Sequence, residues 1–230
     1  MKKITSFLLF LLTILSSPAL FGQLTGTYTI DSAIVTGGSN FQSFTDFADS
    51  INTNGVSGPV TVNVTIGSGP YNQQIVLSTI TGVNATNTVT INGNGETLEY
   101  DATSTDKRIF GLDGADYVTI DSLVIKSLNA TYGYGIHLMN NSDNNTIKRC
   151  IIDLSSITST SSINSAGILA SGSITSTSTD GSNASNTLVQ DNVIKGGTSG
   201  GPYAGIYFNG NGSGSNGLGN DIIGNDITDW

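Results

Sequence analysis

The chain has 230 residues, of which 11% are charged, well below the roughly 25% of typical soluble domains. Its formal net charge is −9. Without residues 1–22, which hold Lys2 and Lys3, six positive against 17 negative charges leave −11. A chain this acidic repels phosphate backbones, so nucleic acid is excluded as an expected partner. Gly, Ser, Thr and Asn replace the missing charges and favour short strands joined by turns.

Residues 1–22 have the features of a secretory signal peptide. Lys2 and Lys3 precede an apolar run from Phe7 to Ile14, and Ser-Ser-Pro and small residues follow. The run is shorter than the about 20 apolar residues that span a bilayer, and no later segment is long and apolar enough to serve as an anchor. We therefore expect cleavage after Gly22 and a secreted or cell-surface protein that is not an integral membrane protein.

Residues 23–58 are predicted to form an N-terminal cap. Ser43 is placed to cap a short helix, and Asp46 falls in its first turn. The apolar residues that share one face of this helix are Phe44, Phe47, Ala48 and Ile51. Such a helix, laid over the first turn of the structure that follows, would cover its apolar end and its unpaired strand groups.

Residues 59–230 are predicted to form stacked short strands. In the segment 59–66, every second residue is apolar, and these residues are Val60, Val62, Val64 and Ile66. Further on, four units overlay, each with an apolar anchor and an apolar partner five residues later. The anchors are Ile120, Ile147, Val189 and Ile222, and their partners are Ile125, Ile152, Ile194 and Ile227. Unequal repeats of this kind predict a solenoid whose strands lie about 4.8 Å apart.

Two further features of the repeats bear on this prediction. The middle positions of the four units are Leu123, Cys150, Asn192 and Asn225, and we expect the last two to pair at a corner in the left-handed conformation. A second series alternates with the first: "IFGL" (109–112), "GIHL" (135–138), "GILA" (167–170) and "GIYF" (205–208). The last unit stops at Trp230, so we expect further coils or domains beyond it.

The repeated pattern Gly-Ile-x-x … Asn-Thr-Ile-x-x-Asn-x-Ile resembles right-handed parallel β-helix repeats of the pectin-lyase-like superfamily, over residues 105–230. The N-terminal part is similar to that of secreted β-helix proteins of Bacteroidetes-type bacteria. This resemblance implies an all-β, right-handed parallel β-helix behind a short capping helix. In the superfamily a broad outer face carries a sugar-binding groove.

Charged side chains recur on neighbouring coils. The expected pairs are Asp121–Lys148, Arg149–Asp191 and the series Lys126–Asp153–Lys195. We interpret them as a charge ladder that fixes the register, in which each exposed pair contributes less than about 1 kcal/mol. The alternative is a catalytic site of a polysaccharide lyase or esterase, for which Asp121, Lys148 and Arg149 are the candidates.

An aromatic column is the candidate ligand site. If Ile109, Ile136, Ile168 and Ile206 point inward, then the residues that point outward are Phe110, His137, Leu169 and Tyr207. Tyr132, Tyr134 and Tyr203 precede two of these strands and would form the rim of a glycan-binding surface. The alternative is that the long insertion 170–187 folds back over the column. The prediction depends on the register, because a slip of one residue reverses every side chain.

Other reactive residues give weaker signals. Cys150 is the only cysteine, so we expect a buried thiol and no internal disulfide. His137 has no identifiable partner for general base chemistry. Asp113 and Asp116 could contribute to a Ca²⁺ site, but a Gly-Asp turn is the commoner arrangement, and we predict no metal site and no cofactor.

The sequence therefore predicts a secreted or cell-surface β-helix module, a scaffold or adhesin without enzymatic activity that contacts a polysaccharide or cell-surface glycan. The alternative is a polysaccharide lyase or carbohydrate esterase with catalytic residues partly beyond Trp230. Ice binding is a third interpretation. It needs a regular threonine array, and the threonines lie mostly in irregular segments.

Overall fold

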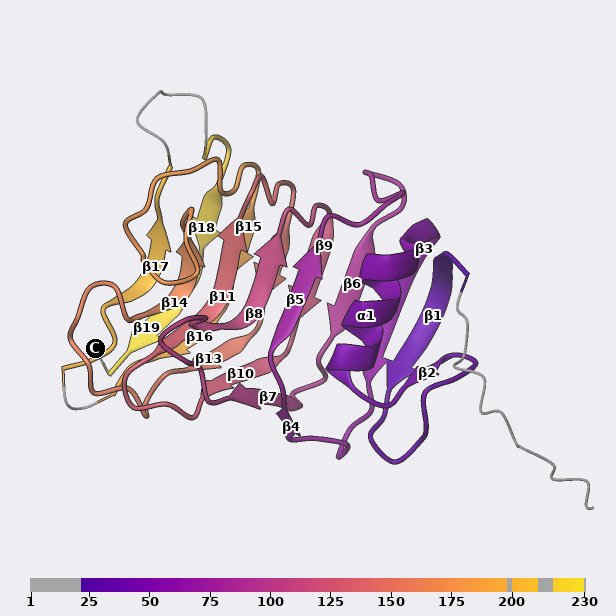
Figure 1. Cartoon of the computed structure of the whole chain (residues 1–230), viewed down its shortest axis with the longest axis horizontal. Coiled ribbons are helices and arrows are strands. Elements are labelled where there is room, and N and C mark those ends of the chain that lie inside the picture. The colour runs from indigo at the N-terminus through magenta and orange to yellow at the C-terminus, as the bar shows by residue number, and fades with distance from the viewer. Residues whose placement is uncertain (1–21, 198–199, 211–216, 230) are drawn as a thin grey trace, which may run out of the picture.

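Three parallel β-sheets and one helix make up the part of the chain that the computed structural model describes, residues 22–197, 200–210 and 217–229 (Figure 1). Sheet A contains β1 (Leu24–Ile30), β2 (Asn40–Phe41), β3 (Val56–Val64), β6 (Val89–Asn92), β9 (Val118–Asp121), β12 (Thr146–Lys148), β15 (Leu188–Gln190) and β18 (Asp221–Ile223). Sheet B contains β4 (Tyr71–Asn72), β7 (Thr97–Tyr100), β10 (Val124–Ser127), β13 (Ile151–Asp153), β16 (Val193–Lys195) and β19 (Asp226–Thr228). Sheet C contains β5 (Ile75–Ser78), β8 (Arg108–Asp113), β11 (Gly133–Met139), β14 (Ser165–Ala170) and β17 (Ala204–Phe208).

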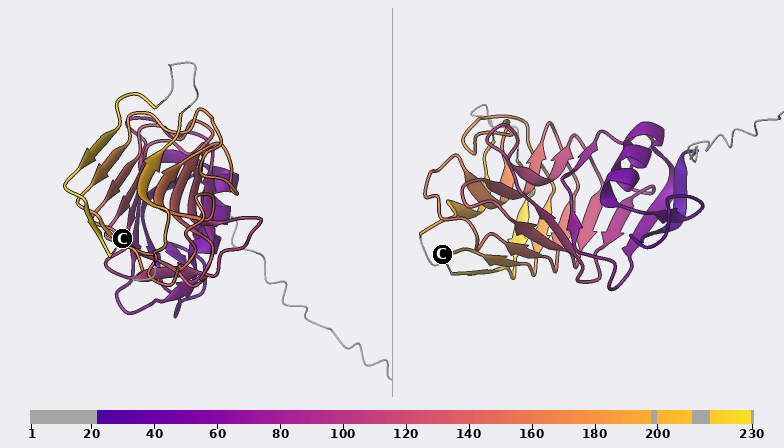
Figure 2. Two further views of the ribbon diagram at one scale, coloured as in Figure 1. Left: turned by 90° about the vertical axis from the view of Figure 1, so that its left-hand side faces the viewer. Right: turned by 60° about the horizontal axis from the view of Figure 1, so that its bottom comes forward.

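From β3 onward the chain visits sheets A, B and C in turn, and each such set of three strands is called a coil here. Strands of successive coils are hydrogen-bonded in parallel, so each sheet runs along the long axis of the molecule, and the end-on view of Figure 2 shows the sheets enclosing a common interior. The arrangement is consistent with a β-helix-like solenoid. The described residues contain no helix whose length and hydropathy would let it cross a membrane.

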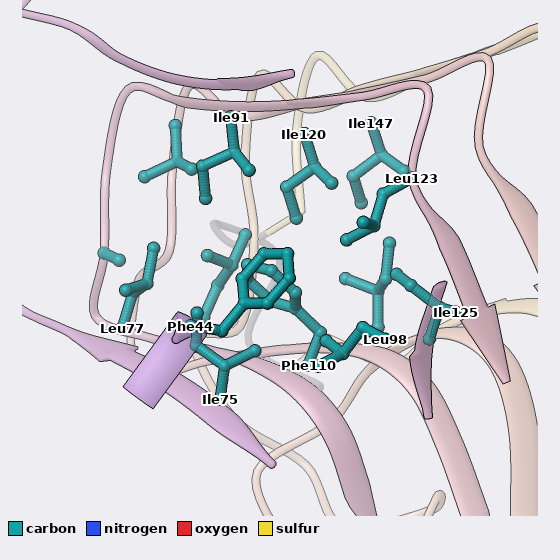
Figure 3. Close-up of a cluster of buried hydrophobic side chains, with 14 of the residues drawn as sticks. Phe44, Ile75, Leu77, Ile91, Leu98, Phe110, Ile120, Leu123, Ile125 and Ile147 are labelled. Carbon is teal, nitrogen blue, oxygen red and sulfur yellow. The ribbon is translucent and has the colours of Figure 1, made fainter. Parts of the chain in front are cut away.

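The predicted apolar columns form the core. In sheet A, Ile120, Ile147 and Val189 are in register and fully buried. In sheet B, Ile125, Ile152 and Ile194 are likewise in register and buried. Figure 3 shows side chains from the three sheets meeting in this interior. The registers of both anchor series are thus confirmed, and burial of these aliphatic side chains is the main favourable term for the fold.

The N-terminal helix of the cap covers the free edge of strand β5. Helix α1 (Phe44–Asn54) begins after Ser43, whose Oγ accepts a hydrogen bond from the amide of Asp46 at 3.0 Å. Asn52 on α1 donates to the carbonyl of Val76 and accepts from the amide of Ser78, both at 2.9 Å. Its carboxamide therefore satisfies the free edge of β5, as a neighbouring strand would.

Two details of the N-terminal prediction are corrected. β3 begins at Val56, before the boundary predicted at residue 59, and β1 of the predicted cap pairs with β3 and extends sheet A. The strand also ends at Val64, so Ile66 lies in the following turn and is 79% exposed instead of facing inward. The turn forms because Gly67 takes a positive φ of 82°.

The left-handed corner lies one residue before the predicted position. Ser122, Arg149, Asp191 and Gly224 adopt positive φ at equivalent places in successive coils. Leu123, Cys150 and Asn192 follow them, and these three side chains are buried. Asn192 and Asn225 do pair, with the Asn192 Nδ2 donating to the Asn225 Oδ1 at 2.8 Å, so the pairing is confirmed and only the backbone conformation was misplaced.

Cys150 lies inside this corner column, as expected. Its thiol is buried, and burial raises its pKa to about 12. The thiol is therefore protonated at neutral pH and serves as a small packing group.

Replacing Asn192 with Ala is expected to lower the free energy of unfolding by about 2–4 kcal/mol. The buried carboxamide accepts from the amide of Cys150 at 2.9 Å and donates to the carbonyl of Ile147 at 3.0 Å. Both backbone groups would lose a partner away from water. Urea denaturation measures the change. Gln190→Ala, at a half-buried position of the adjacent strand β15, is the control and should change stability by less than about 0.5 kcal/mol. Equal stability of the two variants would contradict the proposed role of the amide.

Candidate functional site

The outer face of sheet A carries a column of five threonines in register. They lie on successive strands of the sheet and are Thr27, Thr61, Thr90, Thr119 and Thr146. We call them the threonine column. Neighbouring members are separated by the spacing of hydrogen-bonded strands, about 4.8 Å. The column results from the period-2 alternation of each strand, because the flanking Val60, Val62, Val89 and Ile91 point into the core.

The hydroxyls of this column are open to solvent. Thr27 is exposed and the other four residues are half-buried. Within the described part of the chain, none of the five hydroxyls is hydrogen-bonded to another protein group. Each hydroxyl is both a donor and an acceptor, so the column offers a row of unused hydrogen-bonding groups at a fixed repeat.

A second polar column runs beside the first. Thr29, Asn63 and Asn92 lie on β1, β3 and β6, each two residues after a member of the threonine column. The Nδ2 of Asn92 donates to the Oδ1 of Asn63 at 2.8 Å, which fixes both carboxamides. The N-terminal half of the face is therefore neutral, polar and rigid, with hydroxyl and amide groups in two parallel rows.

The second column continues into the charged residues that the sequence singled out. Asp121 lies beside Asn92, and Lys148 lies beside Asp121. The Asp121 carboxylate is 3.6 Å from the Lys148 ammonium, is paired with the Arg149 guanidinium, and accepts from the Ser122 hydroxyl at 2.8 Å. Its side chain is only 9% exposed.

The three catalytic candidates are therefore together, and Arg149 pairs with Asp121 and not with Asp191 as predicted. Asp121 holds two cations and a hydroxyl, so its oxygens are engaged by groups of the chain itself. This arrangement neutralises the charge of Asp121 and links two adjacent coils. A general base needs an accessible acceptor within reach of the substrate proton, and Asp121 in this pairing does not provide one.

The aromatic column predicted on sheet C does not exist in the predicted form. Phe110 is in register with Ile136, not with His137, and lies in the hydrophobic core. The residue beside His137 is Gly111. The outward row of this sheet is therefore Val76, Gly111, His137, Leu169 and Tyr207.

The physical reason is a local irregularity at the Gly-Ile pairs. On each strand of sheet C from β8 onward, two consecutive residues face inward, namely Ile109–Phe110, Gly135–Ile136, Gly167–Ile168 and Gly205–Ile206. A Cβ at Gly135 would lie 2.5 Å from the Gly167 carbonyl oxygen and 2.5 Å from Ile152, so only glycine fits there. Ile109 lies opposite Gly135, where the other strands have glycine. The predicted register, which paired Ile109 with Ile136, was therefore wrong by one residue on β8.

Most of the outward row is also covered. His137, Leu169 and Tyr134 are fully buried. Lys107 holds the covering segments, because its ammonium donates to the carbonyls of Ile163 at 2.8 Å and Thr175 at 2.7 Å. The predicted alternative, in which the insertion 170–187 folds over this face, is thus the one observed, and a second segment around residue 163 completes the cover.

Lys107 lies among aromatic and carbonyl groups. Its ammonium is 5.3 Å from the ring centroid of Tyr132 and 5.9 Å from that of Tyr134. Burial lowers its pKa, and burial also raises the pKa of the Tyr134 hydroxyl, which donates to the Ile163 carbonyl at 2.6 Å. The buried Tyr134 therefore belongs to a structural cluster with Lys107, and the half-buried Tyr132 lies against the same ammonium.

Besides the half-buried Tyr132, two members of the predicted ligand site remain accessible. Tyr203 is 43% exposed and Tyr207 is half-buried, and their rings meet edge to face at 6.2 Å between centroids. They lie at the β17 end of sheet C, distant in sequence and sheet from the threonine column. They offer one aromatic surface and not the continuous column that was predicted.

The proposed Ca²⁺ ligands have protein partners. Asp113 accepts from the Arg108 guanidinium at 3.3 Å and from Asn140 at 2.6 Å. Asp116 accepts from the amide of Asp143 at 2.7 Å, and burial raises the pKa of Asp116. No group of three or more His, Cys, Asp or Glu residues suited to a metal occurs in the described segments. Asp113 is thus held in an ion pair, and Asp116 holds the backbone of the Asp143 turn.

The threonine column was missed from the sequence, although a signal was present. The residue before the anchor is threonine in two successive units, Thr119 and Thr146. Thr61 and Thr90 could not be added from the sequence, because the repeat pattern does not extend to β3 and β6 and so does not give their register.

Three comparisons, with protein-family models, curated proteins and solved structures, found no match for this chain.

Lowering the pH from about 6.5 to about 4 is expected to destabilise the protein through His137. Burial lowers its pKa from 6.5 to about 4, and the charge of Arg108 also lowers it, against a hydrogen bond with Ser171 and the charges of Asp106 and Asp113. Nδ1 has no hydrogen-bond partner, so a proton there would be unsatisfied. The unfolded chain binds this proton more tightly, so stability is complete above pH 6.5 and falls by up to about 3 kcal/mol at pH 4.

The matched variant is His137→Gln. Its side-chain amide can replace the imidazole Nε2, which lies 3.0 Å from the Ser171 carbonyl oxygen and 3.0 Å from the Ser171 Oγ, and it does not titrate. Urea denaturation at a series of pH values should show the wild type losing more stability than the variant between pH 6.5 and 4. If the free energy of unfolding of the two proteins depended on pH in the same way, His137 would not be the source of the pH dependence.

Proposed function

We propose that this chain is a secreted or cell-surface module with a right-handed parallel β-helix of the pectin-lyase-like kind, acting as a scaffold or adhesin without enzymatic activity. The apolar run at residues 7–14 behind Lys2 and Lys3 supports export, although it falls outside the described residues. The alternation of strands among sheets A, B and C supports the β-helix.

We further propose that the module contacts a linear, neutral glycan along the threonine column. The observation that carries this proposal is the row of five threonine hydroxyls without protein partners, beside the fixed carboxamides of Asn63 and Asn92. Sugar hydroxyls need donors and acceptors in matched positions. A step of about 4.8 Å along the sheet is comparable with the length of one sugar ring in an extended chain.

Charge favours a neutral glycan over an acidic one. The chain without residues 1–22 carries a net charge of −11, which repels polyanions at long range. The threonine column itself carries no charge. A flat polar face of this kind is wet and makes shallow contacts, so each site is expected to bind weakly, and many copies on a surface would add avidity.

The enzymatic alternative has one observation in its favour. Asp121, Lys148 and Arg149 converge beside the β9–β12 end of the threonine column. In a lyase or esterase, the two cations would bind a substrate carboxylate or oxyanion. The engaged state of Asp121 is the reason that we place this function second.

Thr90→Ala combined with Thr119→Ala is expected to weaken glycan retention at least about fivefold, because two central hydroxyls would be lost, each contributing on the order of 0.5–1 kcal/mol. Affinity electrophoresis through a panel of neutral and acidic plant and algal polysaccharides measures retention. Thr45→Ala, on the exposed surface of α1, is the matched control and should migrate as the wild type.

The same panel distinguishes the other functions. Release of unsaturated or reducing ends, abolished by Asp121→Asn, would replace this proposal with the enzymatic one. Thermal hysteresis of a freezing solution, lost in the double threonine variant, would identify ice as the ligand of the threonine column. Retention that is unchanged in the double variant and lost in Tyr207→Ala would move the glycan site to the pair Tyr203–Tyr207.

A further inference from the structure

The outer face of sheet B carries charges of alternating sign. Glu99, Lys126, Asp153 and Lys195 lie on β7, β10, β13 and β16 and are in register. Asn72 on β4 and Thr228 on β19 extend this row at its two ends. We call these six residues the alternating column. Read from β4 to β19, it is neutral, negative, positive, negative, positive and neutral.

An aliphatic row lies beside the alternating column. Val124, Ile151 and Val193 are in register on β10, β13 and β16, each two residues before a charged residue. All three face outward and are half-buried, whereas their neighbours Ile125, Ile152 and Ile194 fill the core. A row of aliphatic side chains on the solvent side of a sheet is typical of a contact surface.

The charges of the alternating column are only partly satisfied within the chain. The Lys126 ammonium is 3.8 Å from the Glu99 carboxylate, and the Lys126 side chain remains 42% exposed. Lys195 is exposed, and no carboxylate of the described residues is within ion-pair distance of it. Among the described residues, Asp153 accepts a hydrogen bond only from the amide of Ser155, at 3.0 Å.

We propose that the outer face of sheet B binds the same face of a second copy of this chain. The two copies are related by a twofold axis parallel to the strands, which passes between β10 and β13. Because such an axis reverses the order of the strands, β7 of one copy faces β16 of the other, and β10 faces β13.

This symmetry pairs every charge of the column with its opposite. Glu99 faces the second copy's Lys195, and Lys126 faces its Asp153, each pair occurring twice. In the aliphatic row, Val124 faces Ile151 across the axis. An alternating row with an even number of charges is therefore complementary to its own reverse, and this match is the reason for choosing a second copy as the partner.

The other face-to-face arrangement is disfavoured. A twofold axis parallel to the long axis of the molecule would place every strand opposite its own equivalent. Lys126 would then face Lys126 and Asp153 would face Asp153, which is repulsive at all four charges. The alternating column thus favours the dimer in which the long axes of the two copies run antiparallel.

The position of the face also suits association of an acidic chain. The described cations outside sheet B are Lys107 and Arg108, which are buried, and Lys148 and Arg149, which are paired with Asp121. The alternating column has no net charge, although the chain carries −9. Two copies can therefore meet at the alternating column without adding repulsion between like net charges.

The size of the contact sets the expected affinity. Sheet B has six strands, which extend over about 25 Å at the spacing of hydrogen-bonded strands. Two rows of side chains over this length place the interface at the small end of specific interfaces, below about 1,200 Å² in total. We expect a reversible dimer with a dissociation constant on the order of 10–100 µM.

Charge reversal in two separate chains tests the arrangement. Lys195→Glu creates two like-charge contacts with Glu99 in the homodimer, and Glu99→Lys creates two with Lys195. Each variant alone should have a dissociation constant at least about tenfold higher than the wild type. In an equimolar mixture, however, the two substituted side chains face each other with opposite charges, and the unchanged Glu99 and Lys195 also face each other. The heterodimer should therefore recover wild-type affinity.

Sedimentation equilibrium of the chain from about 10 to 500 µM gives the dissociation constants. Asp49→Lys, on the exposed side of α1, changes the net charge as Glu99→Lys does and should leave the dimer intact. Recovery in the mixture also shows that the single variants are folded. A wild type that remains monomeric at the highest concentration, or a mixture that associates no better than its components, would overturn the proposal.

Discussion

The fixed spacing between hydrogen-bonded parallel strands is the constraint on which the rest of the structure depends. Because every coil adds one strand to each sheet, a residue at one position is stacked on its equivalents about 4.8 Å away. The same rule makes the buried column of Ile120, Ile147 and Val189 and the amide pair of the buried Asn192 with the half-buried Asn225. It also makes the threonine column and the alternating column on the outside. Inside the molecule, this stacking packs the apolar side chains densely. On the outside, it places equivalent polar and charged side chains at a regular spacing.

The sequence was sufficient for sheets A and B because their strands follow a strict alternation of inward and outward residues. Anchors five residues apart, such as Ile147 and Ile152, flank a short corner of constant length, so overlaying the units gave the registers observed. The α1 cap was predictable for a similar reason, since Ser43 and the apolar face from Phe44 to Ile51 are local signals. These features need no information about distant segments.

Sheet C and its cover could not be derived in the same way. Two inward residues in succession at Gly135–Ile136 break the alternation, and the reason, a backbone approach that leaves no room for a Cβ, appears only when the coils are stacked. The cover depends on Lys107 reaching carbonyls in two long polar segments, whose sequences carry no period. The outward aromatic column predicted through Phe110 and His137 was therefore wrong in its register and in its exposure, whereas the convergence of Asp121 and Lys148 followed from register alone.

Lys107 has a consequence for how the molecule unfolds. In a stack of coils each unit contacts mainly its neighbours, so such chains can open progressively from one end. Lys107, in the segment before β8, donates to Ile163, Asn164 and Thr175, which follow it by 56, 57 and 68 residues along the chain. One side chain thus links the segment before β8 to the segments on either side of β14, two coils further along the chain. The middle of the molecule is therefore expected to behave as one cooperative block, whose loss is all-or-none while the flanking coils can fray.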